Sequence, residues 1–335
     1  MMRIAINGFG RIGRAVFRII ESMPDMEVVA INDLFDTAAL RYQLQYDTVM
    51  GPFEGGVEWV QDEIVTRHTR ARMYQERDPG GLPWRELGID AVVESTGIFR
   101  KREQLQRHLD AGAKRVLLTV PSADKIDYTV VLGVNDQGLK PDHHLVSNAS
   151  CTTNCLAPLV KVLHQAFGLH EGVINTVHAY TNDQSLADVP HADWRRSRAA
   201  AENIIPTSTG AAKAVGEVLP ELNGKLDGIA SRVPVPDGSV VDLYAELKTL
   251  TTTQGLNEEV RLAAETNAFA EVLQYSTEPI VSSDIIGNPH SSIFDASFTQ
   301  VIQGRYVKVL SWYDNEWGYA NRVCDVLKRF AAFST

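Results

Sequence analysis

The sequence predicts an α/β protein in two parts: a doubly wound parallel sheet, then an α+β part with a mixed, mainly antiparallel sheet. Three observations lead to this prediction. Strand-like and helix-like segments alternate along residues 1–150. A glycine-rich turn joins the first strand to the first helix. After residue 150 the pattern changes to long strand-like segments with fewer helices.

The first 150 residues alternate between apolar strands and helical stripes. Residues 4–6 and 28–31 are predicted as buried strands, and apolar residues at helical spacing between them predict a helix. Further elements are predicted as strands at 91–94, 116–120, 129–132 and 144–146, and as a short helix at 103–110. Such alternation predicts a parallel sheet with helices on both faces. Residues 57–74 interrupt it and are interpreted as an antiparallel ribbon.

The second half is richer in strands. They are predicted at 173–180, 229–233, 240–247, 272–275 and 292–311, with helices at 210–218 and 256–270. Residues 315–330 carry a helical apolar stripe. We therefore expect one domain at 1–150, a second at 151–316, and a C-terminal helix at 317–335 that packs back on the first domain.

Composition limits the classes of function. The chain has 335 residues, 44% hydrophobic and 22% charged residues, and a net charge of −10. The acidic balance disfavours nucleic acid or an anionic membrane as the main partner. Three cysteines are too few for a disulfide framework and suit a reducing compartment. No signal peptide or apolar run of membrane-spanning length is recognised, so we expect a cytoplasmic protein.

The glycine-rich turn fits the dinucleotide fingerprint Gly-x-Gly-x-x-Gly. Gly8 permits a tight turn, Gly10 lets backbone approach a pyrophosphate, and Gly13 lets the helix pack against the strand. The pyrophosphate then lies at the helix N-terminus. Because the turn follows a strand and opens a helix, we favour a Rossmann-type nucleotide site over an ordinary glycine turn.

An acidic residue completes this fingerprint. Asp33 follows the second predicted strand at the position where such folds place a ribose-binding carboxylate. A carboxylate accepts hydrogen bonds from a ribose 2′-hydroxyl and repels a 2′-phosphate. The sequence therefore predicts NAD rather than NADP as the cofactor.

Cys151 is the candidate nucleophile. It stands directly before a helical pattern, where unpaired backbone N–H groups and the helix dipole favour a thiolate. His178 is a candidate base, although the sequence alone does not place it near the thiol. Because the domain boundary precedes Cys151, we expect the thiol at a domain seam, where ligands commonly bind.

Other interpretations of Cys151 stay open on the residues alone. A lone cysteine is often an inert buried side chain. Cys155 lies one helical turn away, but no further ligands cluster nearby, so no metal site is expected. A disulfide along one helical turn is sterically awkward.

Several segments carry a resemblance to a known family. The chain resembles phosphorylating, NAD-dependent glyceraldehyde-3-phosphate dehydrogenases over nearly its whole length. The resemblance rests on segments 5–14, 147–154, 178–184, 203–214, 219–225 and 312–316. It implies an NAD-binding Rossmann domain at 1–150 and a catalytic domain at 151–316.

The resemblance also implies a reaction. Cys151 would attack the aldehyde of D-glyceraldehyde 3-phosphate to form a thiohemiacetal, with His178 as base. Hydride loss to NAD would leave a thioester, which inorganic phosphate would convert to 1,3-bisphosphoglycerate. The Cys151 N–H and the His178 ring are candidate donors to the oxyanion.

The resemblance assigns binding residues as well. Thr181 and Arg232 would hold the substrate phosphate, and the attacking phosphate would be held by Ser150, Thr152, Arg196, Thr209 and Gly210. Without the resemblance, the arginines would be equally consistent with a solvated basic surface. Around NAD, the implied contacts are Gly8, Gly10, Arg11, Ile12, Gly13, Asp33, Arg77, Thr119, Asn315 and Tyr319. A homotetramer working in glycolysis is expected from the resemblance.

Departures from the family pattern are few. Met50 and Pro52 replace the usual histidine and basic residue, and Ser185, Ala187 and Asp188 differ from the commonest loop residues. None touches the implied chemistry. The alternatives are erythrose-4-phosphate dehydrogenase, which hydrolyses its acyl-enzyme, and a non-catalytic redox-sensing or RNA-binding adapter on the same scaffold.

Overall fold

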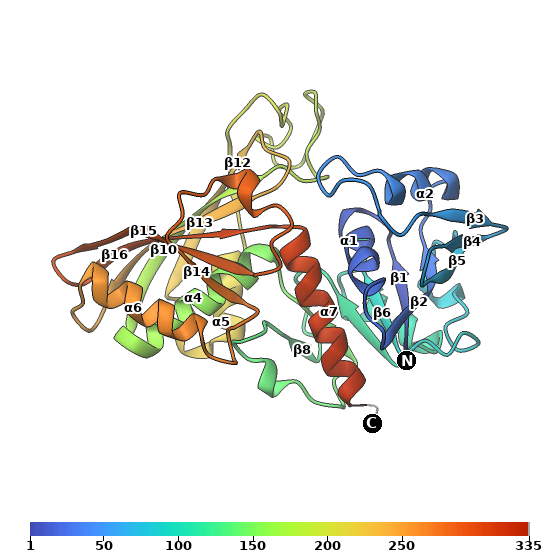
Figure 1. The fold of residues 1–335 in the computed structure, drawn as a ribbon, viewed down its shortest axis with the longest axis horizontal. Helices are drawn as coiled ribbons and strands as arrows, with labels where there is room; N and C mark the ends of the chain where they lie inside the picture. The colour runs from blue at the N-terminus through green and yellow to red at the C-terminus, as the bar shows by residue number, and fades with distance from the viewer. Residues whose placement is uncertain (334–335) are drawn as a thin grey trace. The chain divides into compact units, whose positions relative to one another are not determined.

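A computed structural model of the chain describes residues 1–333. It divides into two compact units, whose elements Figure 1 labels. The first unit comprises Met1–Val130, Gln137–Ala149 and the segment from Ala320 onwards, and the second comprises Val131–Asp136 and Ser150–Tyr319. Each unit is built on one sheet. None of the helices within residues 1–333 has the length and apolar character needed to cross a lipid bilayer.

The sheet of the first unit has the order β3-β4-β5-β2-β1-β6-β7-β9-β8. Its strands are β1 (Met2–Asn7), β2 (Met26–Asn32), β3 (Glu58–Val60), β4 (Glu63–Val65), β5 (Arg70–Tyr74), β6 (Ala91–Glu94), β7 (Arg115–Leu118), β8 (Tyr128–Thr129) and β9 (Leu145–Ser147). Pairing is parallel from β5 to β8, whereas β3, β4 and β5 pair antiparallel. The doubly wound prediction is therefore confirmed, and the predicted ribbon at 57–74 is an antiparallel extension of the same sheet.

The helices of the first unit connect these strands. They are α1 (Arg11–Ile20), α2 (Thr37–Gln45), α3 (Arg102–Asp110) and most of α7 (Trp317–Ala332), with single turns η1 (Pro79–Gly81) and η2 (Asp136–Gly138). α1 buries its apolar stripe, as its spacing predicted. α2 was not predicted, because Leu40 and Leu44 are its only buried residues and this apolar stripe is too narrow to recognise. Near the end of α7, the Arg115 guanidinium packs over Phe330, 5.5 Å from the ring centre.

The second unit has a mixed sheet in the order β11-β12-β10-β13-β16-β15-β14. Its strands are β10 (Leu169–Ala179), β11 (Ile205–Ser208), β12 (Leu226–Val233), β13 (Ser239–Leu247), β14 (Leu273–Ser276), β15 (Ser292–Ile302) and β16 (Tyr306–Tyr313). The pairs β10/β12 and β14/β15 are parallel and the remaining pairs antiparallel. The predicted mixed, mainly antiparallel sheet is confirmed.

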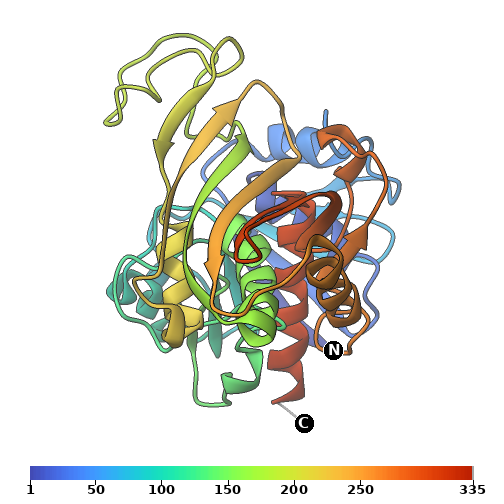
Figure 2. The same cartoon turned by 90° about the vertical axis from the view of Figure 1, so that its left-hand side faces the viewer.

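Helices pack on one face of this second sheet. They are α4 (Cys151–Phe167), α5 (Ala211–Val218) and α6 (Thr253–Ala264), with single turns η3 (Pro220–Leu222) and η4 (Ser282–Ile285). α4 packs against β10, β13, β15 and β16, and Figure 2 looks across these strands with α4 behind them. α4 is the central helix of the unit, and it carries Cys151 at its first position.

One predicted strand proved to be two. The segment 292–311 was predicted as a single strand, but it forms the hairpin β15–β16. The turn contains Gln303 and Gly304, whose φ angles are 51° and 73°. The prediction missed this reversal because a single glycine in an otherwise strand-like run is a weak turn signal.

Candidate active site

The chain turns sharply just before α4 and places Cys151 at the helix start. Ala149 has a φ of 53°, a left-handed conformation that is uncommon for alanine. Ser150 is the N-cap, and its hydroxyl oxygen accepts a hydrogen bond from the Thr153 N–H at 3.0 Å. The first turn contains no acidic residue. The predicted position of Cys151 at a helix N-terminus is therefore correct.

His178 lies beside this thiol. It is the penultimate residue of β10, and its Nε2 atom is 3.6 Å from Cys151 Sγ. Its Nδ1 atom is 2.7 Å from the carbonyl oxygen of Ala179, which only accepts hydrogen bonds. Arg232 Nη1 also lies 3.1 Å from Nδ1, but its two hydrogens are taken by Ala179 O and the Thr181 hydroxyl, so Nδ1 carries the hydrogen and the Nε2 lone pair faces the thiol. This tautomer is the one that a base for Cys151 requires.

Burial opposes charge on either member of this pair. It raises the pKa of the Cys151 thiol to about 11, against the opposite effects of Arg232 and of hydrogen bonds with Thr152. Burial, with the charge of Arg232, lowers the pKa of His178 to about 3. Proton transfer from Sγ to Nε2 forms both charges together, so that each stabilises the other. Burial thus opposes the thiolate that the helix N-terminus favours, and His178 is the adjacent group that can take the proton.

A cluster of anion-binding groups adjoins His178. Strand pairing puts Arg232 of β12 opposite His178 of β10. The Arg232 Nη1 atom donates to Ala179 O at 2.9 Å and to the Thr181 hydroxyl at 3.0 Å. Its Nε atom is buried and has no hydrogen-bond partner among the described residues. A cation with an unused, buried donor suits an anionic ligand.

Asp183 joins the two predicted phosphate-binding arginines. Its carboxylate accepts a hydrogen bond from the Thr181 hydroxyl and another from Arg196 Nη1, the latter at 2.6 Å. The hydrogen bond from Thr181 and the charges of Arg232 and Arg196 hold the pKa of Asp183 below its usual value, although burial acts in the opposite direction. Sequence reasoning did not assign Asp183 a role. An anionic ligand at Arg196 would compete with this carboxylate for the guanidinium.

The other predicted phosphate contacts lie on three segments. Thr152 is buried, and its hydroxyl is 2.8 Å from the Tyr313 hydroxyl. Arg196 also donates from Nε to the Thr207 hydroxyl at 2.9 Å and from Nη2 to Ser208 O at 3.3 Å, directly before Thr209. The Thr209 hydroxyl accepts from the Ala211 N–H at 3.2 Å, at the start of α5. Gly210 is the exposed N-cap of that helix.

The glycine turn of the first unit has the geometry that a dinucleotide needs. Gly8 has a φ of 91°, and a Cβ on it would meet the Thr96 backbone nitrogen at 2.6 Å. A Cβ on Gly13 would meet Gly8 O at 2.2 Å, so helix and turn pack too closely for any side chain. A Cβ on Gly10 would meet nothing within 4 Å, and α1 begins with no side-chain cap and no acidic residue. Open space at a helix start that lacks a side-chain cap fits a pyrophosphate.

The remaining predicted cofactor contacts of the first unit lie around this turn. Asp33 follows β2 directly, and its Oδ2 atom accepts from the Phe9 N–H at 2.7 Å. Arg11 and Ile12 open α1, and the Arg11 guanidinium forms an ion pair with Asp47. Two further predicted contacts follow strands, the exposed Arg77 after β5 and the buried Thr119 after β7.

Asn315 and Tyr319 belong to the second unit. Asn315 is buried, and the Ser239 hydroxyl donates to its Oδ1 atom at 2.6 Å. The Ser239 oxygen in turn accepts from the Ala179 N–H at 3.1 Å, next to His178. Sequence reasoning missed Ser239, because only strand register brings it to both residues. Tyr319 is buried in the first turn of α7.

Asp237 supports Asn315 and gives a pH-dependent prediction. Its Oδ1 atom accepts from the Asn315 N–H at 3.2 Å, and its Oδ2 atom is buried without a donor among the described residues. Burial, then the charges of Asp314 and Glu316, raise its pKa from 3.8 to about 9. The folded state therefore keeps a proton that the unfolded state releases, and stability falls as pH rises from about 4 to about 9.

Replacing Asp237 by asparagine removes this ionisation and keeps the Oδ1 acceptor. The variant is expected to gain stability over the wild type as pH rises, by at most about 1.4 kcal/mol per pH unit. Thermal unfolding at pH 5, 7 and 9 measures the difference. A stability difference that does not change with pH would show that Asp237 is ionised in the folded protein.

The two units together define a class of protein. The first carries a glycine turn of the dinucleotide-binding kind, with the acidic Asp33 directly after β2. The second carries a Cys–His pair beside an arginine cluster. These are the parts of a nicotinamide-dependent oxidoreductase that acts on an aldehyde.

Comparisons with known proteins specify the family. Residues 2–102 match the model described as "Glyceraldehyde 3-phosphate dehydrogenase, NAD binding domain", and residues 150–315 match the corresponding C-terminal domain. The chain is 54% identical to a glyceraldehyde-3-phosphate dehydrogenase of Borreliella burgdorferi over 334 residues, covering 98% of this chain and 99% of that protein. Two relatives of the same name, from Streptomyces coelicolor and Geobacillus stearothermophilus, are each 52% identical to this chain. The first comparison covers 97% of this chain and 97% of the relative, and the second covers 99% of this chain and 98% of the relative. The chain belongs to the glyceraldehyde-3-phosphate dehydrogenase family.

Proposed function

We propose that this chain oxidises D-glyceraldehyde 3-phosphate with NAD and transfers the acyl group to phosphate, which yields 1,3-bisphosphoglycerate. The observation that carries the proposal is the position of the Cys151 thiol, whose Sγ atom is 3.6 Å from His178 Nε2, beside Arg232 and its hydrogen-bond partners. A thiol is suited to this task because a thioester keeps more of the energy of aldehyde oxidation than an oxygen ester does.

Cys151 and His178 perform the acid–base chemistry. Cys151 Sγ attacks the aldehyde carbon while its proton passes to His178 Nε2, and return of that proton to the oxygen completes the thiohemiacetal. The Cys151 N–H, at the start of α4, donates to the developing oxyanion. His178 then takes the hydroxyl proton as the carbon–hydrogen bond breaks, which leaves a thioester on Cys151. NAD supplies the acceptor for the departing hydride.

The proposed cofactor contacts are those that the family resemblance implies. Gly8, Gly10, Arg11, Ile12 and Gly13 hold the pyrophosphate, and Asp33 accepts from the adenosine ribose. The remaining contacts are Arg77, Thr119, Asn315 and Tyr319. Support comes from the open space at Gly10, from the uncapped start of α1, and from the position of Asp33 against the Phe9 N–H.

The arginines hold two phosphates. Arg232 and Thr181 bind the substrate phosphate, and the attacking phosphate is bound by Ser150, Thr152, Arg196, Thr209 and Gly210. A phosphate oxygen attacks the thioester carbon, the carbon–sulfur bond breaks, and Cys151 recovers its proton from His178. The unused Nε donor of Arg232 supports the first site. For the second, Arg196 must exchange its contact with Asp183 for the ligand.

The phosphate dependence of NADH formation tests this function. With glyceraldehyde 3-phosphate, NAD and phosphate, we expect NADH at a rate that falls to a small stoichiometric burst without phosphate. A phosphate-independent rate that favours erythrose 4-phosphate would establish the hydrolytic alternative. Absence of any NADH formation would favour a non-catalytic adapter.

Cofactor choice gives a second prediction. The Asp33 carboxylate follows β2 and repels a 2′-phosphate, and Leu34 adds no positive charge beside it. We expect kcat/KM with NAD to exceed that with NADP. Parallel initial-rate measurements with both cofactors check this, and equal or higher values with NADP would remove Asp33 from its role.

The exposed face of the second sheet supports a homotetramer. Large apolar side chains lie open on it, at Val173, Ile229, Tyr244, Phe298, Ile302 and Tyr306. Register pairs Val173 with Tyr244 and Ile302 with Tyr306, so they share one face, on which a pocket of about 600 Å³ opens. Apolar patches of this kind usually meet a partner, and we propose a second copy of this chain. Light scattering of the protein as it elutes from a size-exclusion column should give the mass of a tetramer. We place the enzyme in the cytoplasm, in glycolysis.

A further inference from the structure

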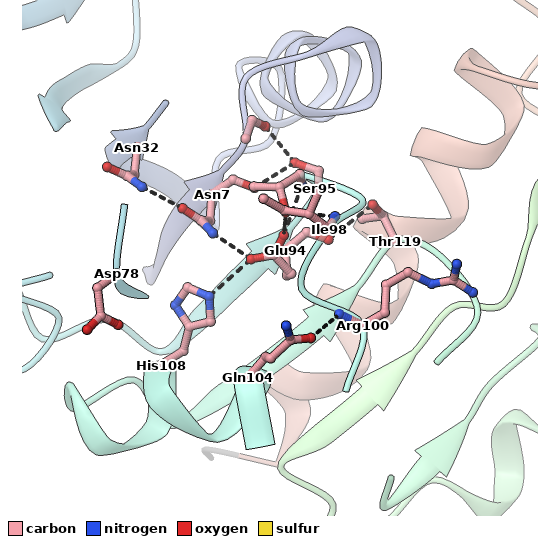
Figure 3. A network of polar contacts seen from close by, with 12 residues as sticks. Asn7, Asn32, Asp78, Glu94, Ser95, Ile98, Arg100, Gln104, His108 and Thr119 are labelled. Carbon is pink, nitrogen blue, oxygen red and sulfur yellow. Dashed lines mark hydrogen bonds and ion pairs between the residues drawn. The ribbon is translucent and has the colours of Figure 1, made fainter. Parts of the chain in front are cut away.

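A buried hydrogen-bond network crosses the first unit at the ends of its strands, as Figure 3 shows. Asn7 ends β1, Asn32 ends β2 and Glu94 ends β6. These strands are parallel neighbours in the sheet, and all three side chains are at most 4% exposed. The reaction steps above use none of them. Three buried polar residues at adjacent strand ends therefore require another explanation.

Glu94 is the centre of the network, and four donors converge on its carboxylate. Oε2 accepts from Asn7 Nδ2 at 2.5 Å and lies 3.1 Å from His108 Nε2. Oε1 accepts from the Thr96 N–H at 2.9 Å and from the Thr96 hydroxyl. The Trp84 indole N–H donates to His108 Nδ1 at 3.0 Å, so the imidazole hydrogen is on Nε2 and points to Glu94. All four of these groups donate, so their common partner must accept hydrogen bonds and donate none. An ionised carboxylate is such a group.

The side-chain hydrogen bonds from Asn32 through Asn7 all donate in one direction, toward Glu94. The Glu76 N–H donates to Asn32 Oδ1 at 2.8 Å, and Asn32 Nδ2 donates to Asn7 Oδ1 at 2.7 Å. Asn7 Nδ2 then donates to Glu94. Turning either amide over would place donor against donor, which costs the desolvation of a buried polar group. The donor sequence therefore ends at Glu94 and depends on its negative charge.

The network members at the strand ends adjoin proposed cofactor contacts. Asn7 precedes Gly8, Asn32 precedes Asp33, and Glu76 precedes Arg77. Thr119 donates to the Glu94 carbonyl oxygen from its N–H at 3.0 Å and from its hydroxyl at 3.1 Å. The next residue after Glu94, Ser95, donates from its hydroxyl to Gly8 O at 2.6 Å. The Glu94 carboxylate thus links the end of β6 to the ends of β1 and β2, and its backbone carbonyl links β6 to the end of β7.

We propose that Glu94 is a positioning residue for NAD: its carboxylate locks the ends of β1, β2 and β6 into the arrangement that binds the cofactor. The inference rests on NAD binding as proposed above and adds a residue that does not itself touch the ligand. Preorganisation of this kind acts on affinity, because a loosened site must be ordered again each time the ligand binds.

The test compares Glu94→Gln with Asp90→Asn. An amide at position 94 leaves at least one of the four donors facing another donor, whichever way it turns. Asp90 lies just before the other end of β6 and also accepts two hydrogen bonds, from the Arg3 N–H at 2.8 Å and from Lys114 Nζ at 2.7 Å. Both variants lose a negative charge from the ends of one strand, but only position 94 belongs to the network.

Calorimetric titration of the cofactor-free protein with NAD gives the dissociation constants, at a temperature where thermal scans show every variant folded. We expect at least about tenfold weaker binding for Glu94→Gln and no more than about a twofold change for Asp90→Asn. KM for NAD should rise similarly, while kcat at saturating NAD stays within about threefold. If Glu94 served only to stabilise the fold, Glu94→Gln would unfold at a lower temperature, and the folded variant would bind NAD as tightly as the wild type.

Asn32→Ala provides the second variant. It removes the amide that links Glu76 to Asn7 and leaves the Glu94 carboxylate in place. If Glu94→Gln does not fold, about threefold or greater weakening of NAD binding in Asn32→Ala supports the proposal. Variants that bind NAD as tightly as Asp90→Asn would overturn it. A wild-type protein that binds no NAD would instead refute the proposed function, so the two failures are distinguishable.

Discussion

Cys151→Ser is expected to lose oxidation of glyceraldehyde 3-phosphate and to keep NAD binding. A serine hydroxyl is far less acidic than a thiol, and His178, whose pKa burial lowers to about 3, is too weak a base to activate it. An oxygen ester would also keep less of the oxidation energy for phosphate transfer. The NAD contacts lie on other residues, so cofactor affinity should be unchanged.

Steady-state rates and calorimetric NAD titrations of the same preparation measure both properties. Cys155→Ser is the matched control: Cys155 lies one turn along α4, fully buried, and its thiol donates to Ser311 O at 3.6 Å, a contact that a hydroxyl can make. The control should oxidise the substrate at close to the wild-type rate. More than about a tenth of wild-type activity in Cys151→Ser would show that another group is the nucleophile.

His178→Asn is expected to lower the oxidation rate by roughly 10²–10⁴-fold, the usual contribution of a positioned base. It should also raise the pKa of the Cys151 thiol. Burial already raises that pKa to about 11, and the imidazole at 3.6 Å is the group that can take the proton. Without it, the thiolate must form alone in a buried site.

Alkylation of Cys151 by iodoacetamide, followed across pH, separates these effects. The wild type should react at a lower pH than His178→Asn, because the thiolate is the reactive form and its proton has an acceptor nearby. An unchanged rate–pH profile in the variant would remove His178 from the base role. Circular dichroism of both proteins controls for misfolding.

Much of the fold was predictable from local patterns. The strands around the glycine turn are apolar runs bounded by Gly8 and Asp33, and β6 was predicted with the observed bounds, 91–94. Elements without such a pattern were missed. α2 buries only two residues, and β11 (Ile205–Ser208) alternates buried and exposed positions over four residues, too few to recognise. Hairpin β15–β16 was merged because Gly304 is a single weak signal.

The candidate site was predictable where sequence neighbours carry it, as in the glycine turn and in the cysteine at the start of α4. It was not predictable where distant strands meet. Register alone brings Arg232 opposite His178, and Ser239 between Ala179 and Asn315. Charge state was also missed, because burial depends on the whole fold. Asp237 and the Cys151 thiol both have raised pKa values for this reason.

The covalent intermediate on Cys151 is the most direct test of the proposed reaction. The protein is mixed with glyceraldehyde 3-phosphate and NAD in phosphate-free buffer, quenched in acid, and its mass measured intact and after digestion. We predict a mass increase of one 3-phosphoglyceroyl group per chain, on the peptide that contains Cys151, which disappears when phosphate is added before the quench. An adduct on another residue, or NADH formation without any acyl-enzyme, would contradict a reaction carried by Cys151.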